Sequence, residues 1–300
     1  MKLFFSVILY SLLLLSSTSF SQNINVNSLQ PIDAEAYMKP LSTWFGTYFN
    51  SGAYYDADVP EVFGFKFSII GMWSVVPEDQ KAFQPNPPDN VIGDVGSTAT
   101  VFGNKSSYYL GSNGFYTYPT GLSLNAVPSG IFQFAGSLFN TELMVRFFPE
   151  VKFDNAKVGL LGFGLKHEIS SHFPEIPLDI AVQILINNFN FEFDDGDPVN
   201  YTKVKSSNFA FNVHASKSFS VLTVYGGLQY ESTSMDFSYF HENPDENSTS
   251  LNKVYDLKLD GDNNFRFTLG GAVKLGVFVI NGDVNFTKFT TFTTGLSLDF

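Results

Sequence analysis

Histidine is the side chain best suited to general base chemistry at neutral pH, and the chain has four, at positions 167, 172, 214 and 241. His214 lies two residues before Ser216, so on a strand both side chains would point to the same face. A serine hydrolase needs such a pair at hydrogen-bond distance. His241 stands in the acidic segment 240–247, where an aspartate–histidine pair could form. An ordinary polar inner face and a solvated loop explain both positions more simply, so we assign no catalytic residue.

A possible calcium loop begins at Asp260, where Asp260-Gly-Asp262-Asn-Asn264 carries oxygen ligands at positions one, three and five. Position six is Phe265 instead of glycine, and position twelve is Gly271 instead of an acidic residue. The segment is therefore better interpreted as a turn at the end of a hairpin. The sequence contains no phosphate-binding glycine loop and no metal-ligand cluster, and we expect no cofactor.

Composition excludes several classes of protein. The 300 residues include 17 basic and 29 acidic side chains, a net charge of −12, which argues against binding to nucleic acid. Aromatic residues make up 17% of the chain, and 34 of them are phenylalanine, so disorder is not expected. Charged residues make up only 15%, against about 25% in soluble domains. After residue 21 no apolar stretch approaches the roughly 20 residues of a helical membrane span. An all-β protein remains.

The N-terminus has the features of a secretory signal peptide. A basic start, Met1-Lys2, precedes an apolar run over 3–15, and small residues occupy positions 19 and 21. We expect residues 1–21 to be removed by cleavage before Gln22, which predicts an exported protein. The sequence has no cysteine, so it has neither a lipid-anchoring cysteine nor disulfides.

Polar and apolar residues alternate over long stretches. On the last strand one face carries Phe292, Leu296, Leu298 and Phe300, the C-terminal residue. A terminal aromatic residue on such a strand looks like the assembly signal of bacterial outer-membrane barrels, which implies the barrel-assembly machinery as a partner. The predicted strands span roughly 10–16 residues, close to the ~9–11 of a tilted membrane strand. They are longer than the ~5–6 residues common in globular sheets. These features predict a transmembrane antiparallel up-and-down β-barrel embedded in outer-membrane lipid.

We expect about ten strands, with 10–14 possible, at 44–55, 61–76, 140–151, 157–169, 177–193, 205–217, 219–234, 263–275, 277–287 and 290–300. The barrel would then occupy 44–300, after an N-terminal periplasmic segment at 22–43. Counting back from Phe300 puts the short turns at 218–219 and 276–277 on the periplasmic side. The same count puts the long acidic connections 194–204 and 235–262 outside the cell, as in bacterial barrels.

Two regions depart from this pattern. The Pro-, Gly- and Asn-rich segment 77–139 falls on the periplasmic side of the count, where connections should be short. It is expected to form a lumenal plug, a periplasmic insertion or an extra hairpin such as 98–103 with 107–117. At Asn187–Asn188 the apolar residues change face, which indicates either a β-bulge or a strand that leaves the bilayer.

The inward faces of the predicted strands carry nearly balanced charge. The lumen-facing candidates are Lys66, Glu142, Arg146, Asp179, His214, Glu231, Arg266, Lys274 and Asp283. With Lys166, Glu168 and Asp299 they amount to five basic and six acidic groups. A wide ion-selective porin would carry an excess of one sign at its constriction. Barrels of about eight strands are filled by side chains, whereas open channels take roughly 16. We therefore expect a mostly closed lumen with paired charges.

Four stretches of the chain are distinctive: TELMVRFFP at 141–149, GLLGFGLKHEI at 159–169, PLDIAVQ at 177–183 and ATVFGN at 99–104. Together they resemble an uncharacterised, domain-of-unknown-function family of outer-membrane β-barrel proteins from Bacteroidetes-type bacteria. The resemblance covers most of the chain after residue 21. It implies a barrel in the outer membrane and brings no catalytic residues.

The sequence thus favours a non-enzymatic, narrow transport or binding barrel for a solute or partner that it does not identify. The alternative is a structural or interaction barrel that anchors a partner, and a membrane-surface hydrolase is the third possibility.

If Phe300 completes an assembly signal, deleting it or replacing it with a charged residue should lower the amount of folded barrel in the outer membrane. The folded form can be measured by its altered electrophoretic mobility before and after heating. An unchanged yield of this form would contradict the assignment of 290–300 as the closing strand.

Overall fold

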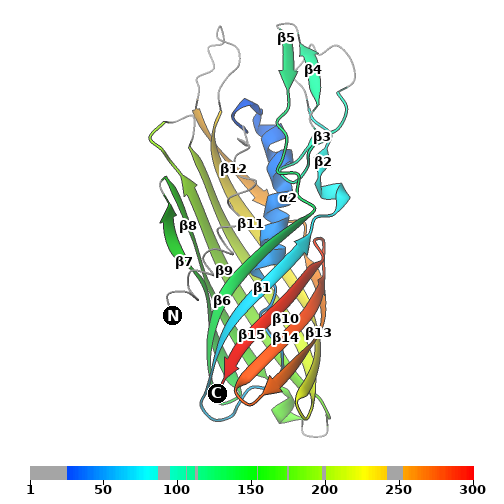
Figure 1. The fold of residues 1–300 in the computed structure, drawn as a ribbon, viewed down its shortest axis with the longest axis vertical. Helices are drawn as coiled ribbons and strands as arrows, with labels where there is room; N and C mark the ends of the chain where they lie inside the picture. The colour runs from blue at the N-terminus through cyan, green and yellow to red at the C-terminus, as the bar shows by residue number, and fades with distance from the viewer. Residues whose placement is uncertain are drawn as a thin grey trace.

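The chain forms a closed barrel of ten antiparallel strands in the computed structural model, which describes residues 26–86, 95–105, 107–111, 114–153, 155–173, 176–197, 201–241 and 253–300. The predicted signal peptide and its cleavage site lie outside these residues. The wall strands are β1 (Gly64–Val75), β6 (Ala126–Leu138), β7 (Thr141–Phe153), β8 (Ala156–Glu168), β9 (Asp179–Phe193), β10 (Thr202–Phe219), β11 (Leu222–His241), β13 (Phe265–Leu275), β14 (Phe278–Phe286) and β15 (Thr291–Asp299). Each pairs with its neighbour, and β1 pairs with β15 to close the ring (Figure 1).

The two ends of the barrel differ in the length of their connections. At the end that carries the C-terminus, β6 and β7 are joined by Phe139 and Asn140, both with positive φ (52° and 55°), as a tight two-residue hairpin turn requires. Gly276 serves the same purpose between β13 and β14, with φ 64°. The opposite end, here called the long-loop end, is where β1, β9 and β11 end and β6, β10 and β12 (Lys253–Asp260) begin, with 76–125, 194–201 and 242–252 between them in the sequence. Nine of the ten predicted strands are confirmed, and so is the barrel fold.

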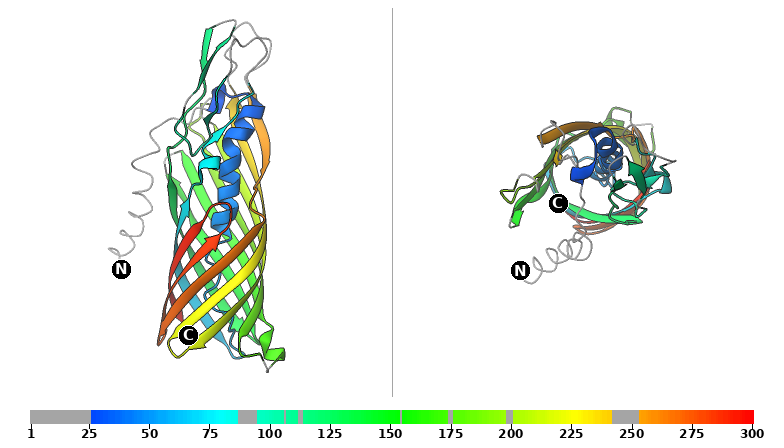
Figure 2. Two further views of the ribbon diagram at one scale, coloured as in Figure 1. Left: turned by 90° about the vertical axis from the view of Figure 1, so that its right-hand side faces the viewer. Right: turned by 90° about the horizontal axis from the view of Figure 1, so that it is seen from above.

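The predicted strand 44–55 is wrong, because a helix occupies most of this segment. Helix α2 (Pro31–Phe49) lies inside the upper part of the barrel, near the long-loop end (Figure 2). Proline at the first helical position is favourable because its missing N–H needs no partner there. Residues 26–43 therefore lie within the barrel at the long-loop end and do not form a segment at the C-terminal end. Among the described helices, none has both the length and the hydropathy needed to cross a membrane.

The segment 77–139 contains a wall strand, β6, that the sequence did not reveal. Above Phe132, β6 pairs with β1 but not with β7, so Pro128 lies on an open strand edge, where a missing N–H is tolerated. The remainder forms the short strands β2 (Ala82–Phe83), β3 (Thr98–Ala99), β4 (Tyr108–Gly111) and β5 (Gly114–Thr117). The expected pairing of 98–103 with 107–117 is wrong, because β3 pairs with β2 and the hairpin present here joins β4 to β5. Because β6 adds one strand to the count back from Phe300, the connection 76–125 lies at the long-loop end, opposite the end that carries the C-terminus.

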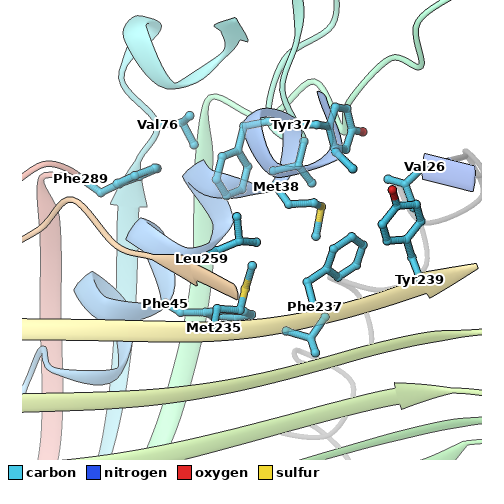
Figure 3. Close-up of a cluster of buried hydrophobic side chains, with 14 of the residues drawn as sticks. Val26, Tyr37, Met38, Phe45, Val76, Met235, Phe237, Tyr239, Leu259 and Phe289 are labelled. Atoms are coloured by element: carbon cyan, nitrogen blue, oxygen red, sulfur yellow. The ribbon is translucent and has the colours of Figure 1, made fainter. Parts of the chain in front are cut away.

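The barrel wall reverses its polarity between its two halves. In the lower half the outward side chains are apolar and the inward ones are polar. On β9 the register continues through Asn187–Asn188 without a shift, so the expected bulge is wrong. Instead the apolar face moves inward: the Phe189 ring lies 4.9 Å from that of Phe45 and 5.2 Å from that of Phe49. The upper lumen thus encloses a hydrophobic core around α2 (Figure 3).

The outer wall above this reversal is polar. Strands β9, β10, β11 and β12 (Lys253–Asp260) place Asn190, Lys205, Asp236 and Lys258 side by side on the outer face. The neighbouring row includes Glu192 and Lys203, whose charged atoms lie 2.7 Å apart. Charged side chains on the lipid face of a membrane barrel are destabilising. The bilayer therefore ends below these rows, and the upper barrel projects beyond it.

The seam between the first and last wall strands has an aromatic exterior. Phe292, Leu296 and Phe300 are exposed on the outer face of the barrel, and Leu298 is half-buried there. The Phe300 ring stacks on that of Phe65 with their centroids 4.6 Å apart. This position fits contact with lipid, and the role of Phe300 in assembly stays a prediction.

The orientation of the barrel in the membrane can be tested with single engineered cysteines, because the protein has no native cysteine. Ser28 is exposed at the long-loop end and Ser218 at the other. If long connections face outward, a membrane-impermeant maleimide on intact cells should label Ser28→Cys and spare Ser218→Cys. Both variants should react after the cells are broken. Labelling of Ser218→Cys alone on intact cells would mean that the barrel has the opposite orientation.

Candidate functional site in the barrel lumen

The lumen is occupied along its length by one continuous segment, residues 26–63, here called the plug. It comprises the short helix η1 (Val26–Ser28), helix α2 and an extended stretch from 50 to 63. It enters at the long-loop end and descends to the start of β1 at the C-terminal end (Figure 2). Three groups of contacts hold it, at the top, middle and bottom of the barrel.

At the top, the described part of the connection 76–125 closes over α2. The Asp33 carboxylate accepts hydrogen bonds from the Asn86 N–H (2.8 Å) and from the Tyr118 hydroxyl (3.0 Å). The Tyr37 hydroxyl donates to the carbonyl oxygen of Thr120. Burial raises the pKa of Asp33, and the two hydrogen bonds counteract part of that rise. The connection and the helix therefore form one packed unit.

In the middle, Arg146 on β7 binds the last turn of α2. Its Nη1 donates to the carbonyl oxygen of Phe49 (2.7 Å) and its Nη2 to that of Ser51 (2.6 Å). The side chain is fully buried. Unpaired carbonyl groups give the C-terminus of a helix a partial negative charge, so a cation is favourable there. Arg146 thus fixes the point at which the helix ends inside the barrel.

Arg266 on β13 approaches the same turn of the plug from the other side of the lumen. The two arginines and the side chains that hold residues 47–51 with them are here called the collar. Its guanidinium donates to the carbonyl oxygen of Thr47 (2.8 Å) and pairs with Glu231 (2.9 Å). It also donates to the hydroxyl oxygen of Ser51. Two amides add to the collar at Asn50: Asn187 donates to its side chain (3.2 Å) and Gln229 to its carbonyl oxygen (3.4 Å). The turn 47–51 is therefore held by polar groups from opposite walls.

At the bottom, Asp56 of the plug joins a buried cluster of charges. Lys66 and Lys166 each approach Oδ1 of Asp56 at 3.3 Å. The same two lysines also pair with the two carboxylate oxygens of Glu142, at 3.3 and 3.4 Å. Two cations and two anions thus neutralise each other, as buried charges require. Only one of the four, Asp56, belongs to the plug.

His214 and Ser216 make contacts with the plug rather than with each other. The His214 ring stacks on that of Tyr54 (centroids 3.9 Å apart), and its Nδ1 is 2.8 Å from Oδ1 of Asn212. The hydroxyl oxygen of Ser216 accepts a hydrogen bond from the Ala57 N–H (2.9 Å). These contacts explain both residues as parts of the lumen lining.

The other predicted candidates are placed as follows. Asp283 is buried and accepts hydrogen bonds from the Tyr225 hydroxyl (2.8 Å) and the Asn285 amide (2.6 Å). Lys274 is exposed near the C-terminal end, where it pairs with Asp299 (3.0 Å), and Asp179 is half-buried at that end. The plug residues were missed because their aromatic run resembles a strand, although Pro31 followed by Asp33 is a helix-start signal.

The possible calcium loop and His241 are structural features in the described residues. Residues 261–264 separate β12 from β13, which pair with successive parts of β11, so they do not form the hairpin end expected. Asp262 pairs with Lys39 of α2 (3.2 Å), and the Asn263 amide donates to Glu231 (2.8 Å). His241 lies against the Tyr255 ring, and the acidic loop after it is outside the described residues. No described group of three or more His, Asp or Glu side chains is placed to hold a metal.

Comparison with known proteins supplies a family. A family model described as a family of unknown function (DUF6588) matches residues 1–300, so the chain belongs to that family. This confirms the resemblance to an uncharacterised domain family. Among curated proteins no match was found.

Several solved structures show a distant similarity to this chain. The translocator domain of the autotransporter NalP from Neisseria meningitidis is 11% identical, with 89% of this chain and 97% of that one covered and a TM-score of 0.31. A porin mutant of Rh. blastica is 9% identical, with 80% and 100% covered and a TM-score of 0.17. The toluene transporter TodX of Pseudomonas putida is 7% identical, with 81% and 90% covered and a TM-score of 0.20.

Arg146 can be tested as the residue that holds the plug. Replacing it with alanine leaves two buried carbonyl oxygens without a donor, at a cost of about 1–3 kcal/mol each. Arg146→Ala should therefore increase the rate of chymotrypsin cleavage after Phe49, which is buried in the closed barrel, in the detergent-solubilised protein, because α2 leaves the lumen more often. Lys205→Ala, which removes a cation from the outer wall, should leave the rate unchanged. Equal rates in Arg146→Ala and the wild type would contradict the assignment.

Proposed function

We propose that this member of the DUF6588 family is a non-enzymatic outer-membrane conduit that its own N-terminal segment holds closed. The observation that carries the proposal is the way in which the plug is attached. It contacts the wall through packed side chains, hydrogen bonds and ion pairs, and none of its described residues belongs to the ring of strands. The ring is continuous without it, so the plug can move while the barrel stays closed.

The lining of the lower lumen supports a passage for solute. Its inward residues are mostly polar, and include Ser68, Gln133, Asn187, Asn208, Asn212 and Asn281. Short hydroxyl and amide side chains leave space at the axis, which the plug now fills. A small barrel that serves only as a rigid anchor can be filled by side chains of its own wall. Here, in contrast, a polar wall surrounds a separate segment. Such a lumen can fill with water when the segment moves away.

A second candidate function is an anchor for a partner outside the cell. The extent of the core between α2 and the connection 76–125 favours it, because this packing makes a permanent structure at the long-loop end. In that case the plug would never leave the lumen, and every variant described below would stay closed.

Asp56→Lys should open the conduit. The substitution places a third cation between Lys66 and Lys166, and like charges in a buried site repel strongly. Conductance steps in planar lipid bilayers should be small and infrequent for the wild type and larger and more frequent for Asp56→Lys.

Asp58→Lys is a matched control for this experiment. It makes the same change of charge two residues away on the plug, where the side chain is exposed. The neighbouring negative charges of Asp56, Glu168 and Asp179 would attract a lysine at this position. It should behave as the wild type does. Large steady currents from the wild type would contradict a closed conduit, and closed behaviour of Asp56→Lys would favour the anchor.

A further inference from the structure

We propose that the opened conduit selects small anions and that Arg146 binds them as they pass. This inference rests on the proposed function and names the class of solute. It follows from which charges in the lumen depend on the plug for a partner and which are paired within the wall.

At the levels of the collar and the Asp56 cluster, positive charge exceeds negative charge on the wall. The five basic side chains there are Lys66, Arg146, Lys166, Arg266 and Lys274, and the four acidic ones are Glu142, Glu231, Asp283 and Asp299, which is opposite Lys66 in the strand register. Asp56 of the plug makes the numbers equal. Withdrawal of the plug therefore leaves the wall at these levels with one excess positive charge.

The acidic groups keep their partners when the plug leaves. Glu142 remains between Lys66 and Lys166, at 3.3 and 3.4 Å. Glu231 remains paired with Arg266 and hydrogen-bonded to the Gln229 amide (2.7 Å). Asp283 keeps its hydrogen bonds from Tyr225 and Asn285. Each carboxylate is thus satisfied by the barrel itself.

Arg146 is different, because both of its hydrogen-bond acceptors belong to the plug. Its two terminal nitrogens each hold one carbonyl oxygen, at 2.7 and 2.6 Å. A guanidinium binds the two oxygens of a carboxylate or phosphate through the same fork of donors. The carbonyl oxygens of Phe49 and Ser51 therefore occupy the positions that an oxyanion would take. An anion that enters from either end can replace them, whereas a cation meets an unpaired positive charge.

The remaining acidic groups of the lumen lie near the C-terminal end. Asp299 keeps its partner Lys274 when the plug leaves, and Glu168 accepts a hydrogen bond from Ser170 (2.8 Å). Asp179 is half-buried in the same region. Arg146 is the wall cation that loses both of its hydrogen-bond acceptors when the plug leaves, so we place the selection at Arg146.

The test is the reversal potential of a plug-displaced variant in a planar bilayer with a potassium chloride gradient. Gly46→Leu displaces the plug without a change of charge, because a Cβ at Gly46 would lie 2.2 Å from Oγ1 of Thr233 and 2.4 Å from Nδ2 of Asn263. The reversal potential should shift from zero toward the equilibrium potential of chloride. Gly96→Leu is the control for the size of the side chain, since nothing lies within 4 Å of that Cβ position.

Two substitutions in the Gly46→Leu background separate Arg146 from general surface charge. Arg146→Gln should move the reversal potential back toward zero. It should also abolish the block of chloride current by added inorganic phosphate. Lys205→Gln removes the same charge from the outer face of β10 and should change neither.

The outcomes distinguish this inference from the proposed function. A reversal potential on the potassium side, or one that Arg146→Gln does not alter, would overturn anion selection and leave the conduit intact. If neither Gly46→Leu nor Asp56→Lys conducts, and urea added to the wild type produces no reversible current, the conduit itself is wrong. If urea alone opens the wild type, its current must show the same shift toward chloride.

Discussion

The structure depends on a single constraint: the backbone polar groups of the plug lie inside the closed ring of strands and need partners within the protein. The end of helix α2 makes this constraint severe, because its last carbonyl groups lie in the middle of the barrel, far from bulk water. Arg146 and Arg266 meet it from opposite walls by donating to the carbonyl oxygens of Phe49, Ser51 and Thr47. Without these two cations the helix could not end at this depth.

The same constraint explains why the barrel has two zones. Above the collar most backbone groups of the helix bond within it, so the wall can present apolar side chains to it, and Met235, Phe237 and Leu259 pack there. Below the collar the plug is extended, and its backbone must bond to the wall. The Ser216 hydroxyl and the Glu168 carboxylate accept from the N–H groups of Ala57 and Val59. The change from apolar to polar lining therefore coincides with the end of the helix.

The polarity of the outer surface is set separately, by whether lipid or water surrounds it. In the lower half it is apolar because it faces lipid, and in the upper half it carries rows of lysine and acidic residues. On β9 the inner and outer faces both change polarity at Asn187–Asn188. This strand therefore carries its apolar residues outward below this point and inward above it. The upper barrel thus resembles a water-soluble protein with a core, built on a membrane-spanning base.

The sequence by itself determined the class of the protein and most of its wall. Alternation with a period of two is a local property, so β1, β7 to β11 and β13 to β15 could be predicted from it, as could the inward direction of Arg146, Glu231 and Arg266. Only the tertiary structure decided what fills the barrel. The segment 44–55 has an aromatic run that suits either a strand or a helix buried on all sides, and its surroundings selected the helix. Strand β6 contains Pro128, which is tolerated only because its neighbour β7 diverges there. The plug also depends on pairs such as Lys166 with Asp56, 110 residues apart, and no local pattern records a contact over that distance.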